Sequence, residues 1–220
     1  MLGATGAVGK QVVRTLVKAD NIKQLTLLGR REVEDISSDT ITIHQHKVDV
    51  HTPDSYDEFL SAHDVAICTL GVGQPSKISK EDFIKIDKTA VLDFAKGCKR
   101  AGVKHFELLA SVGIDAKSNS FYLRIKGELV EALKDLGFDR FSIFQPSMIL
   151  TPTNRYGFSQ GVLLKVWPLL TPLLIGGLKK YRGIKIETLG KSIALNVFTK
   201  GSGTQELTWN DFHIICDSLS

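Results

Sequence analysis

A tyrosine and a lysine four residues apart, Tyr122 and Lys126, lie in a segment whose apolar pattern predicts a helix over residues 121–137. That spacing puts both side chains on one face of the helix. An ammonium group beside a phenol favours the phenolate, so the tyrosine can exchange a proton with a carbonyl or an alcohol. Ser111 ends a strand predicted over residues 103–111, where its hydroxyl can bond the same substrate oxygen. These three are the candidate catalytic residues; the alternative is an amphipathic surface helix.

The same Tyr-x-x-x-Lys spacing recurs at Tyr181 and Lys185. Gly183 lies between them and the stretch KIETLG that follows is predicted to be extended, so no helix is expected there. Of these two Tyr-x-x-x-Lys pairs, Tyr122 and Lys126 are therefore the one assigned to the catalytic site.

Three evenly spaced glycines precede the helix predicted over residues 7–19. Glycine permits a tight turn and lets backbone N–H groups approach a pyrophosphate, and the following helix points its positive end at that charge. A flexible loop is the alternative. The residues expected to bind a dinucleotide here are Gly3, Thr5, Gly6, Ala7, Val8 and Gly9.

The next strand ends in Arg30 and Arg31, with no carboxylate to bind a ribose 2′-hydroxyl. Two guanidinium groups there can bind a 2′-phosphate, which predicts NADP(H) as the cofactor. A solvated basic strand end is the other interpretation.

Two further strand ends supply candidate cofactor contacts. Asp49 and Val50 close the third strand, where a carboxylate can meet the adenine amino group. Leu70 and Gly71 lie in TLGVG, where a glycine lets the backbone pass close to adenine and ribose. Strand ends also carry Asp and Gly for turn formation alone.

Strands and helices alternate through residue 147, which predicts a doubly wound parallel α/β sheet in the strand order 3-2-1-4-5-6. After residue 150 the pattern loosens, and we expect a small C-terminal region on the substrate side. The chain is predicted to be one domain over 1–220, with 151–185 as a substrate-side or partner-side insertion. The predicted strands are 25–30, 40–50 (one strand or a pair), 63–73, 103–111 and 139–147, and the predicted helices are 7–19, 55–62, 81–101 and 121–137.

Only Met1 and Leu2 precede the glycine turn, so the first strand is expected to be truncated. That strand is central in the predicted order, and its loss leaves two unpaired edges within the sheet. We therefore expect the sequence to be shortened at its start.

Four stretches carry a family resemblance: GATGAVG, LLGRR, LASVGIDAKSNSFYLRIKGELVEAL and DRFSIFQPSMIL. They resemble an atypical short-chain dehydrogenase/reductase, in the branch of the HIV-Tat-interacting proteins, and the similarity runs from Gly3 to about residue 198. It implies a Rossmann-type fold that binds NADPH through the glycine turn and the arginines. Tyr122 and Lys126 then also contact the cofactor, and Pro146 lies near the nicotinamide, with Ser147 where relatives carry glycine or a similar residue.

The resemblance implies an NADPH-dependent oxidoreductase acting on a small carbonyl or alcohol. A non-catalytic NADPH-binding sensor or interaction scaffold is the alternative, and an epimerase or isomerase that recycles its cofactor is a third interpretation. Fold alone does not separate these classes.

Composition and charge limit the classes of partner that we expect. The 220 residues are 43% hydrophobic with a net charge of +4, and the basic residues are dispersed, so no nucleic-acid partner is expected. The three cysteines have no metal-binding spacing and predict reduced thiols in a cytoplasmic protein. His44, His46 and His51 fit no common zinc site, so no metal is expected.

Residues 161–178 are unusually apolar. Lys165, Pro168 and Pro172 argue against a membrane-spanning helix there. The segment predicts a buried flap, a dimer surface or a peripheral contact with a membrane.

Overall fold

The computed structural model describes residues 1–151 and 174–219, and within them strands alternate with helices as the sequence predicts. The strands are β1 (Gln24–Gly29), β2 (Thr42–Lys47), β3 (Val65–Cys68), β4 (His105–Leu109), β5 (Arg140–Phe144), β6 (Ile149–Leu150), β7 (Ile184–Lys185) and β8 (Gly203–Leu207). The α-helices are α1 (Ala7–Leu16), α2 (Lys80–Ile84), α3 (Val91–Arg100), α4 (Phe121–Lys134), α6 (Ile186–Asn196) and α7 (Trp209–Ser218). Shorter helical turns are η1 (Pro53–Ser55), η2 (Asp57–Leu60), η3 (Pro75–Lys77), the π-helical η4 (Lys85–Ala90) and η6 (Gly176–Tyr181).

The main sheet is parallel and is joined at its centre by Leu2. This residue bridges Leu28 in β1 and Cys68 in β3. The strand order is therefore β2-β1-Leu2-β3-β4-β5-β8. The predicted order is confirmed, and β8 adds one strand at the edge that the sequence did not suggest.

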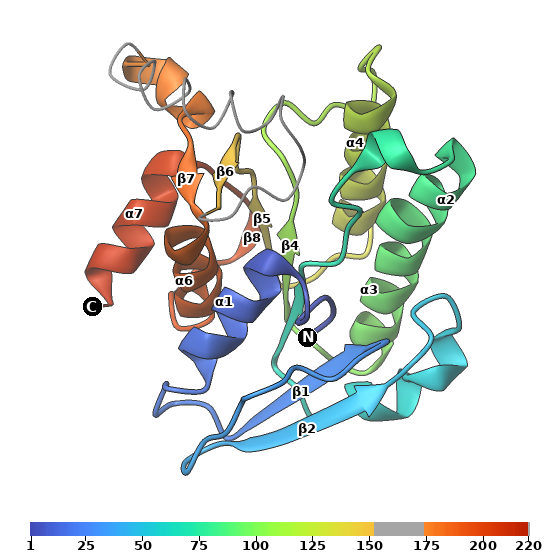
Figure 1. Ribbon diagram of the computed structural model, residues 1–220, viewed down its shortest axis with the longest axis vertical. Helices are drawn as coiled ribbons and strands as arrows, with labels where there is room; N and C mark the ends of the chain where they lie inside the picture. The colour runs from blue at the N-terminus through green and yellow to red at the C-terminus, as the bar shows by residue number, and fades with distance from the viewer. Residues whose placement is uncertain (152–173, 220) are drawn as a thin grey trace.

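Helices cover both faces of this sheet, which makes it doubly wound (Figure 1). α1, α6 and α7 pack on one face, and α3 and α4 pack on the other. Each face encloses an apolar core. Phe94, Phe106 and Leu129 lie in the core under α3 and α4, and Val12 and Ile193 lie in the core under α1 and α6.

The C-terminal region is more regular than the sequence predicts. KIETLG was expected to be extended, but α6 begins at Ile186 and includes most of it, so that prediction is wrong. Gly190, a weak helix former, lies where α6 crosses α1, and a Cβ there would stand 3.1 Å from the Gln11 carbonyl carbon. Packing against α1 therefore stabilises a helix in a segment whose own residues do not favour one.

Several helices and strands have boundaries that differ from those predicted from the sequence. The predicted strand 40–50 is one strand, Thr42–Lys47, and the predicted helix 55–62 is replaced by the 3-10 turns η1 and η2. The predicted helix 81–101 is built from α2, η4 and α3 in succession.

The insertion predicted over 151–185 lies partly outside the described residues, and its role stays a prediction. Its two ends meet, because Ile149 in β6 pairs with Ile184 in β7. Of the apolar segment 161–178, residues 161–173 lie outside the described part of the chain, and Ile175 and Leu178 are exposed.

Tyr181 ends η6 and Lys185 lies in β7, so they share no helix, as expected. All three cysteines are buried and none forms a disulfide. Within residues 1–151 and 174–219, no helix combines the length and the hydropathy needed to cross a membrane.

Candidate functional site

A cavity of about 440 Å³ lies at the carboxyl ends of the central strands. In an open parallel sheet this is where ligands bind. Its walls come from segments that are far apart in the sequence: the first turn of α1, the loop after β3, η4, the end of β4, the start of α4, the chain after β5 and the start of α6. The lining residues are Gly6, Ala7, Val8, Thr69, Leu70, Gly71, Val72, Gly73, Asp87, Leu109, Ala110, Tyr122, Lys126, Ser147, Met148, Ile149, Thr151 and Ile186.

The glycine turn has the geometry that a phosphate site needs. Gly3 has a φ of +90°, and a Cβ there would lie 2.5 Å from the Leu70 nitrogen, so only glycine fits. Gly6 is the N-cap of α1 and makes no side-chain capping bond. The first turn of α1 contains no acidic residue. Its N–H groups and positive helix end are therefore left for an anion at the cavity wall.

A buried ion pair lies beside the loop after β3. Lys126 Nζ is 2.6 Å from Asp87 Oδ1, and both side chains are almost fully buried. Asp87 Oδ2 also accepts the Val72 N–H at 2.7 Å. At Gly71 a Cβ would stand 3.1 Å from Asp87 Oδ1, so this glycine lets the loop approach the pair.

The ion pair fixes the charge state of Lys126. Burial alone lowers the pKa of this ammonium group, but the charge of Asp87, with a smaller contribution from Tyr122, raises it above its ordinary value. Lys126 is therefore charged at neutral pH, and Asp87 balances much of that charge.

Sequence reasoning missed Asp87, which lies in the π-helical turn η4. Residues 81–101 were predicted as one long helix, and no acidic residue in it was given a role. Phe83, Asp87 and Val91 follow one another at intervals of four residues, so an acid on the apolar face was the available signal. Buried acids are nearly always paired, and π-helical turns are frequent at functional sites.

Tyr122 lies at the start of α4 and lines the cavity, and its ring packs on Phe83 with the centroids 5.6 Å apart. The structure thus brings Tyr122, Lys126 and the glycine turn to one cavity, as the sequence predicts. A second ion pair holds the elements of this site together. Lys88 Nζ lies 2.6 Å from Glu128 Oε2, and this contact ties η4 to α4.

Ser111 is placed differently. It is half-buried in the loop after β4 and does not line the cavity, and its Oγ donates only a long bond of 3.4 Å to the Val112 carbonyl. Pro146 is buried and also does not line the cavity, whereas its neighbours Ser147 and Met148 do. The Val112 N–H donates to the Pro146 carbonyl at 3.0 Å, which joins these two loops.

The remaining predicted cofactor contacts lie outside the cavity. Arg30 and Arg31 are exposed directly after β1. The Asp49 carboxylate accepts bonds from the His51 N–H and the Thr52 hydroxyl, both at 3.0 Å, and these bonds hold the pKa of Asp49 below its ordinary value.

Asp49 therefore stabilises the turn after β2, the simpler of its two interpretations, and an adenine contact from it stays a prediction. Val50 is buried in the core under α3, so its side chain faces away from solvent. Thr5 belongs to the glycine turn but does not line the cavity.

Comparison with known proteins supports the binding of NAD(P)H by this chain. A family model described as NAD(P)H-binding matches residues 3–156, which contain the glycine turn, Tyr122 and Lys126. Protein HTATIP2 of Rattus norvegicus is 30% identical over 210 residues, covering 96% of this chain and 85% of the rat protein. Protein FMP52-1 of Scheffersomyces stipitis is 29% identical over 193 residues, covering 88% of this chain and 80% of the yeast protein.

Solved structures share the fold at low sequence identity. MoeE5 in complex with UDP-glucuronic acid and NAD has a TM-score of 0.71 at 12% identity, over 100% of this chain and 81% of that one. The oxidoreductase ylbE of Lactococcus lactis has a TM-score of 0.66 at 19% identity, over 100% of this chain and 96% of that one.

One prediction is overturned by these relatives. FMP52-1 and its counterparts in Emericella nidulans and Candida albicans are named as mitochondrial proteins, so the predicted cytoplasmic location is wrong.

The other comparisons agree with the sequence resemblance and with the cavity built from the glycine turn. The chain belongs to the NAD(P)H-binding family, together with protein HTATIP2, and it has the Rossmann-type fold of short-chain dehydrogenases/reductases.

Proposed function

We propose that this protein reduces a small carbonyl compound with NADPH and that Tyr122 donates the proton. The observation that carries the proposal is the shared cavity, where the open N-terminus of α1, the Gly71 loop, Tyr122 and Lys126 meet. An oxidoreductase of this type needs its phosphate site and its proton donor at one cavity, and the shared lining of this cavity supports the proposal.

The residues present fit a dinucleotide. The first turn of α1 offers uncapped N–H groups for a pyrophosphate, and at Gly71 a Cβ would intrude on Asp87. Arg30 and Arg31 are exposed after β1, where two guanidinium groups can bind the 2′-phosphate that distinguishes NADPH from NADH. NADPH, when bound there, supplies the hydride.

The protein's own chemistry is then a proton transfer. The Tyr122 O–H donates its proton to the carbonyl oxygen while the carbonyl carbon accepts the hydride, so the products are an alcohol and NADP⁺. Lys126 has three N–H donors and uses one for Asp87. The others are available for the ribose and the tyrosine oxygen, and the cation stabilises the phenolate that forms. Ser111 orients the carbonyl in this proposal on the family resemblance alone.

The cavity also suggests the character of the substrate. Beyond Tyr122, its wall is formed largely by Leu109, Met148, Ile149 and Ile186, with Ser147 and Thr151 as polar neighbours. A small aldehyde or ketone with an apolar body fits such a lining.

A second candidate function is NADPH binding without turnover, as in a redox sensor. Two observations favour it: Ser111 does not line the cavity, and Asp87 balances much of the Lys126 charge that would activate the tyrosine.

Tyr122→Phe separates the two functions. For a reductase, we expect kcat to fall by about 100-fold or more, because general acid catalysis contributes on that scale. The Kd for NADPH should change by less than about twofold, because the phosphate site is untouched. The measurement is NADPH absorbance during turnover of a panel of small aldehydes and ketones, with fluorescence titration for the Kd.

Tyr181→Phe is the matched control, since Tyr181 belongs to the other Tyr-x-x-x-Lys pair and lies in η6. Full activity in Tyr122→Phe would contradict Tyr122 as the proton donor. NADPH binding with no turnover by the unaltered protein on any carbonyl would contradict the reductase and favour the sensor.

A further inference from the structure

The helical turn η6 presents apolar side chains to the surroundings of the molecule. In the part of the chain that the structure describes, five large hydrophobic side chains are exposed, and three of them belong to this turn: Ile175, Leu178 and Tyr181, which are 67%, 51% and 37% exposed. Single exposed apolar residues are ordinary, but several in one short element mark a contact surface. None of the three lines the cavity that holds Tyr122 and Lys126, so the proposed reaction does not account for them.

The three side chains share one face because η6 is a 3-10 helix. The Leu178 N–H donates to the Ile175 carbonyl at 3.1 Å, and the Arg182 N–H donates to the Lys179 carbonyl at 3.0 Å. Side chains three residues apart are eclipsed in such a helix. Ile175, Leu178 and Tyr181 therefore stand in one line, which we call the apolar row.

The stretch that carries the apolar row is also basic. Lys179, Lys180, Arg182 and Lys185 follow closely on one another, and residues 174–186 contain no acid. Lys180 is exposed and Lys179 is half-buried. The turn η6 thus combines an exposed apolar face with a local positive charge.

Contacts with α7 hold η6 in place. The Arg182 guanidinium lies 5.0 Å from the centroid of the Trp209 ring, and its Nε donates to the Leu174 carbonyl at 2.8 Å. Trp209 Nε1 donates to the Gly183 carbonyl at 3.0 Å. These contacts orient the apolar row before anything binds to it, so binding costs little conformational entropy.

The turn lies next to the elements that line the reaction cavity. In Figure 1 it is the orange helix above β7, into which its chain continues. Ile184 in β7 pairs with Ile149 in β6, and both Ile149 and Ile186 line the cavity. A partner bound to the apolar row would therefore be adjacent to the substrate side of the cavity.

We propose that η6 binds the surface of a membrane that contains anionic lipids. The apolar row inserts at the boundary between headgroups and acyl chains, and Lys179 and Lys180 lie beside the lipid phosphates. Helices that lie in a membrane interface have this composition, with apolar side chains on one face and Lys or Arg beside them. Tyrosine is enriched at the same depth, and lysine side chains extend from it to the charged headgroups.

A lipid surface is favoured over a protein partner. Lysine is depleted in protein–protein interfaces, whereas each lysine near an anionic membrane adds to the binding. A second copy of this chain is also disfavoured, because two η6 turns in contact would bring the same basic residues against each other.

The first test measures binding of the full chain to vesicles by co-sedimentation. One set contains phosphatidylcholine with about 30 mol% phosphatidylglycerol, and the other contains phosphatidylcholine alone. We expect at least about tenfold tighter binding to the anionic vesicles, and a loss of that difference at high salt, because salt screens the lysines. Equal binding to both sets would overturn the proposal. Binding to neither would also overturn it and would favour a protein partner.

The second test removes each half of the surface in turn. Lys179→Gln with Lys180→Gln should weaken binding to the anionic vesicles by at least about tenfold, because each lysine near the surface contributes about fivefold. Ile175→Ser with Leu178→Ser should weaken it by at least about tenfold as well, because the inserted apolar area is lost. Both pairs of side chains lie outside the core, so the fold should remain intact, which circular dichroism checks.

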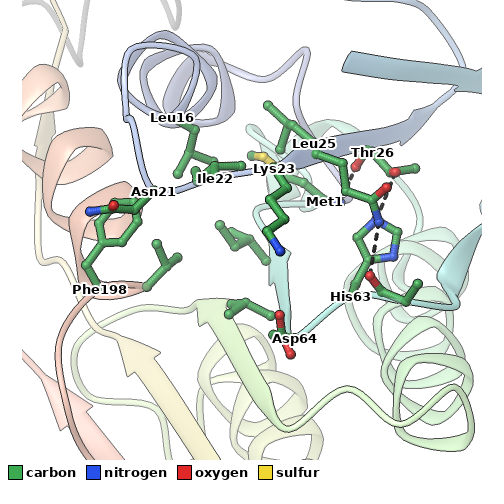
Figure 2. A pocket seen from close by; sticks show the side chains of 15 residues that line it. Met1, Leu16, Asn21, Ile22, Lys23, Leu25, Thr26, His63, Asp64 and Phe198 are labelled. Atoms are coloured by element: carbon green, nitrogen blue, oxygen red, sulfur yellow. Dashed lines mark hydrogen bonds between the residues drawn. The ribbon is translucent and has the colours of Figure 1, made fainter. Parts of the chain in front are cut away.

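Each double variant has a matched control elsewhere on the surface. Lys18 and Lys23 are exposed, and Figure 2 shows Lys23 near Met1, beside a cavity of about 480 Å³ between β1 and β3. Lys18→Gln with Lys23→Gln should bind the vesicles as the unaltered chain does. Ile214 and Leu219, exposed on α7 and at its end, provide the apolar control as Ile214→Ser with Leu219→Ser. Equal losses in test and control variants would overturn the assignment to η6.

The third test shows whether the apolar row enters the lipid. A single NBD label is attached at Leu178→Cys, and the three native cysteines are buried. Its emission should rise at least about twofold and shift to the blue on anionic vesicles, because the label leaves water. The same label at Ile214→Cys should change little. Vesicle binding without a change at position 178 would overturn insertion of η6. None of these readouts depends on reductase activity.

Discussion

Lys126 shows how a single buried charge is kept in place at the proposed site. Its ammonium group lies in a nearly dry environment, where an unpaired cation is strongly destabilising. Asp87 supplies the opposite charge and at the same time holds the Val72 N–H, so one carboxylate positions both the lysine and the loop after β3. The Tyr-x-x-x-Lys chemistry thus depends on a third residue that lies outside the motif.

Asp87→Asn should lower the free energy of unfolding by about 3–5 kcal/mol, because it leaves Lys126 buried without a counter-charge. Urea unfolding measures this. Asp93→Asn is the matched control, since Asp93 lies in the following helix α3 and forms a partly exposed pair with Lys96 at 3.7 Å. That pair should contribute less than about 1 kcal/mol. Similar losses in the two variants would contradict the role of the buried pair.

Residue spacing predicted part of this site. Tyr122 and Lys126 were found because a four-residue spacing on a helix fixes which face both occupy. Asp87 was not found, because its partner Lys126 lies 39 residues further along the chain. The role of a carboxylate on an apolar helix face becomes clear only when the charged partner is known. Ser111 was predicted to lie at the site but does not line the cavity. Its position at the end of a strand does not determine where its hydroxyl points.

A polar cluster buried between β4, β5 and α6 joins three elements. The Glu107 carboxyl oxygen Oε1 accepts a bond from the Asn196 amide at 2.7 Å, and the His105 ring bonds the Ser142 hydroxyl at 2.9 Å. Burial raises the pKa of Glu107 to about 8, and burial, helped by the charge of Arg140, lowers the pKa of His105 to about 3. Both groups are therefore neutral at pH 7, and their contact of 3.5 Å is not an ion pair.

These shifts predict how stability depends on pH. Between pH 4.5 and 8 the unfolded state ionises Glu107 while the folded state keeps its proton, so stability falls as pH rises. Between pH 3 and 6.5 the unfolded state protonates His105 while the folded state does not, so stability rises with pH. The two effects oppose each other between pH 4.5 and 6.5, and only the Glu107 effect remains from pH 6.5 to 8.

From pH 6.5 to 8 we expect a loss of about 2 kcal/mol in unfolding free energy from this group, at roughly 1.4 kcal/mol per pH unit. Glu107→Gln should remove most of that loss, because the amide does not titrate. Urea unfolding of both proteins at the two pH values measures it, and parallel pH profiles would contradict a raised pKa at Glu107.

At the scale of elements, the sequence predicted the strand and helix alternation through β5 because the apolar periodicities there are strong. It did not predict α6 or β8. α6 contains Gly190 at its contact with α1, and β8 reads GTQEL, with one apolar residue, because it is an edge strand that packs little surface. Both elements are specified by their neighbours more than by their own residues.

At the scale of the whole molecule, the parallel sheet brings segments that are far apart in the sequence to one cavity at the carboxyl ends of its strands, and this cavity holds the proposed chemistry. The sequence predicted the sheet order that makes this possible, with Leu2 between β1 and β3 at the centre. It did not predict which side chains the folded chain brings into the cavity, because loops such as the one after β3 are positioned by contacts with distant residues such as Asp87.

The central claim is selective NADPH binding, and the most direct measurement is fluorescence titration of the unaltered protein with NADPH and with NADH. We predict a Kd for NADPH at least about tenfold lower, a difference of about 1.4 kcal/mol, which two charged contacts to a 2′-phosphate readily supply. The double variant Arg30→Ser with Arg31→Ser should lose this preference. Its charge-matched control, Arg14→Ser with Lys18→Ser, should keep it. Equal affinity for the two cofactors, or no binding of either, would contradict the account.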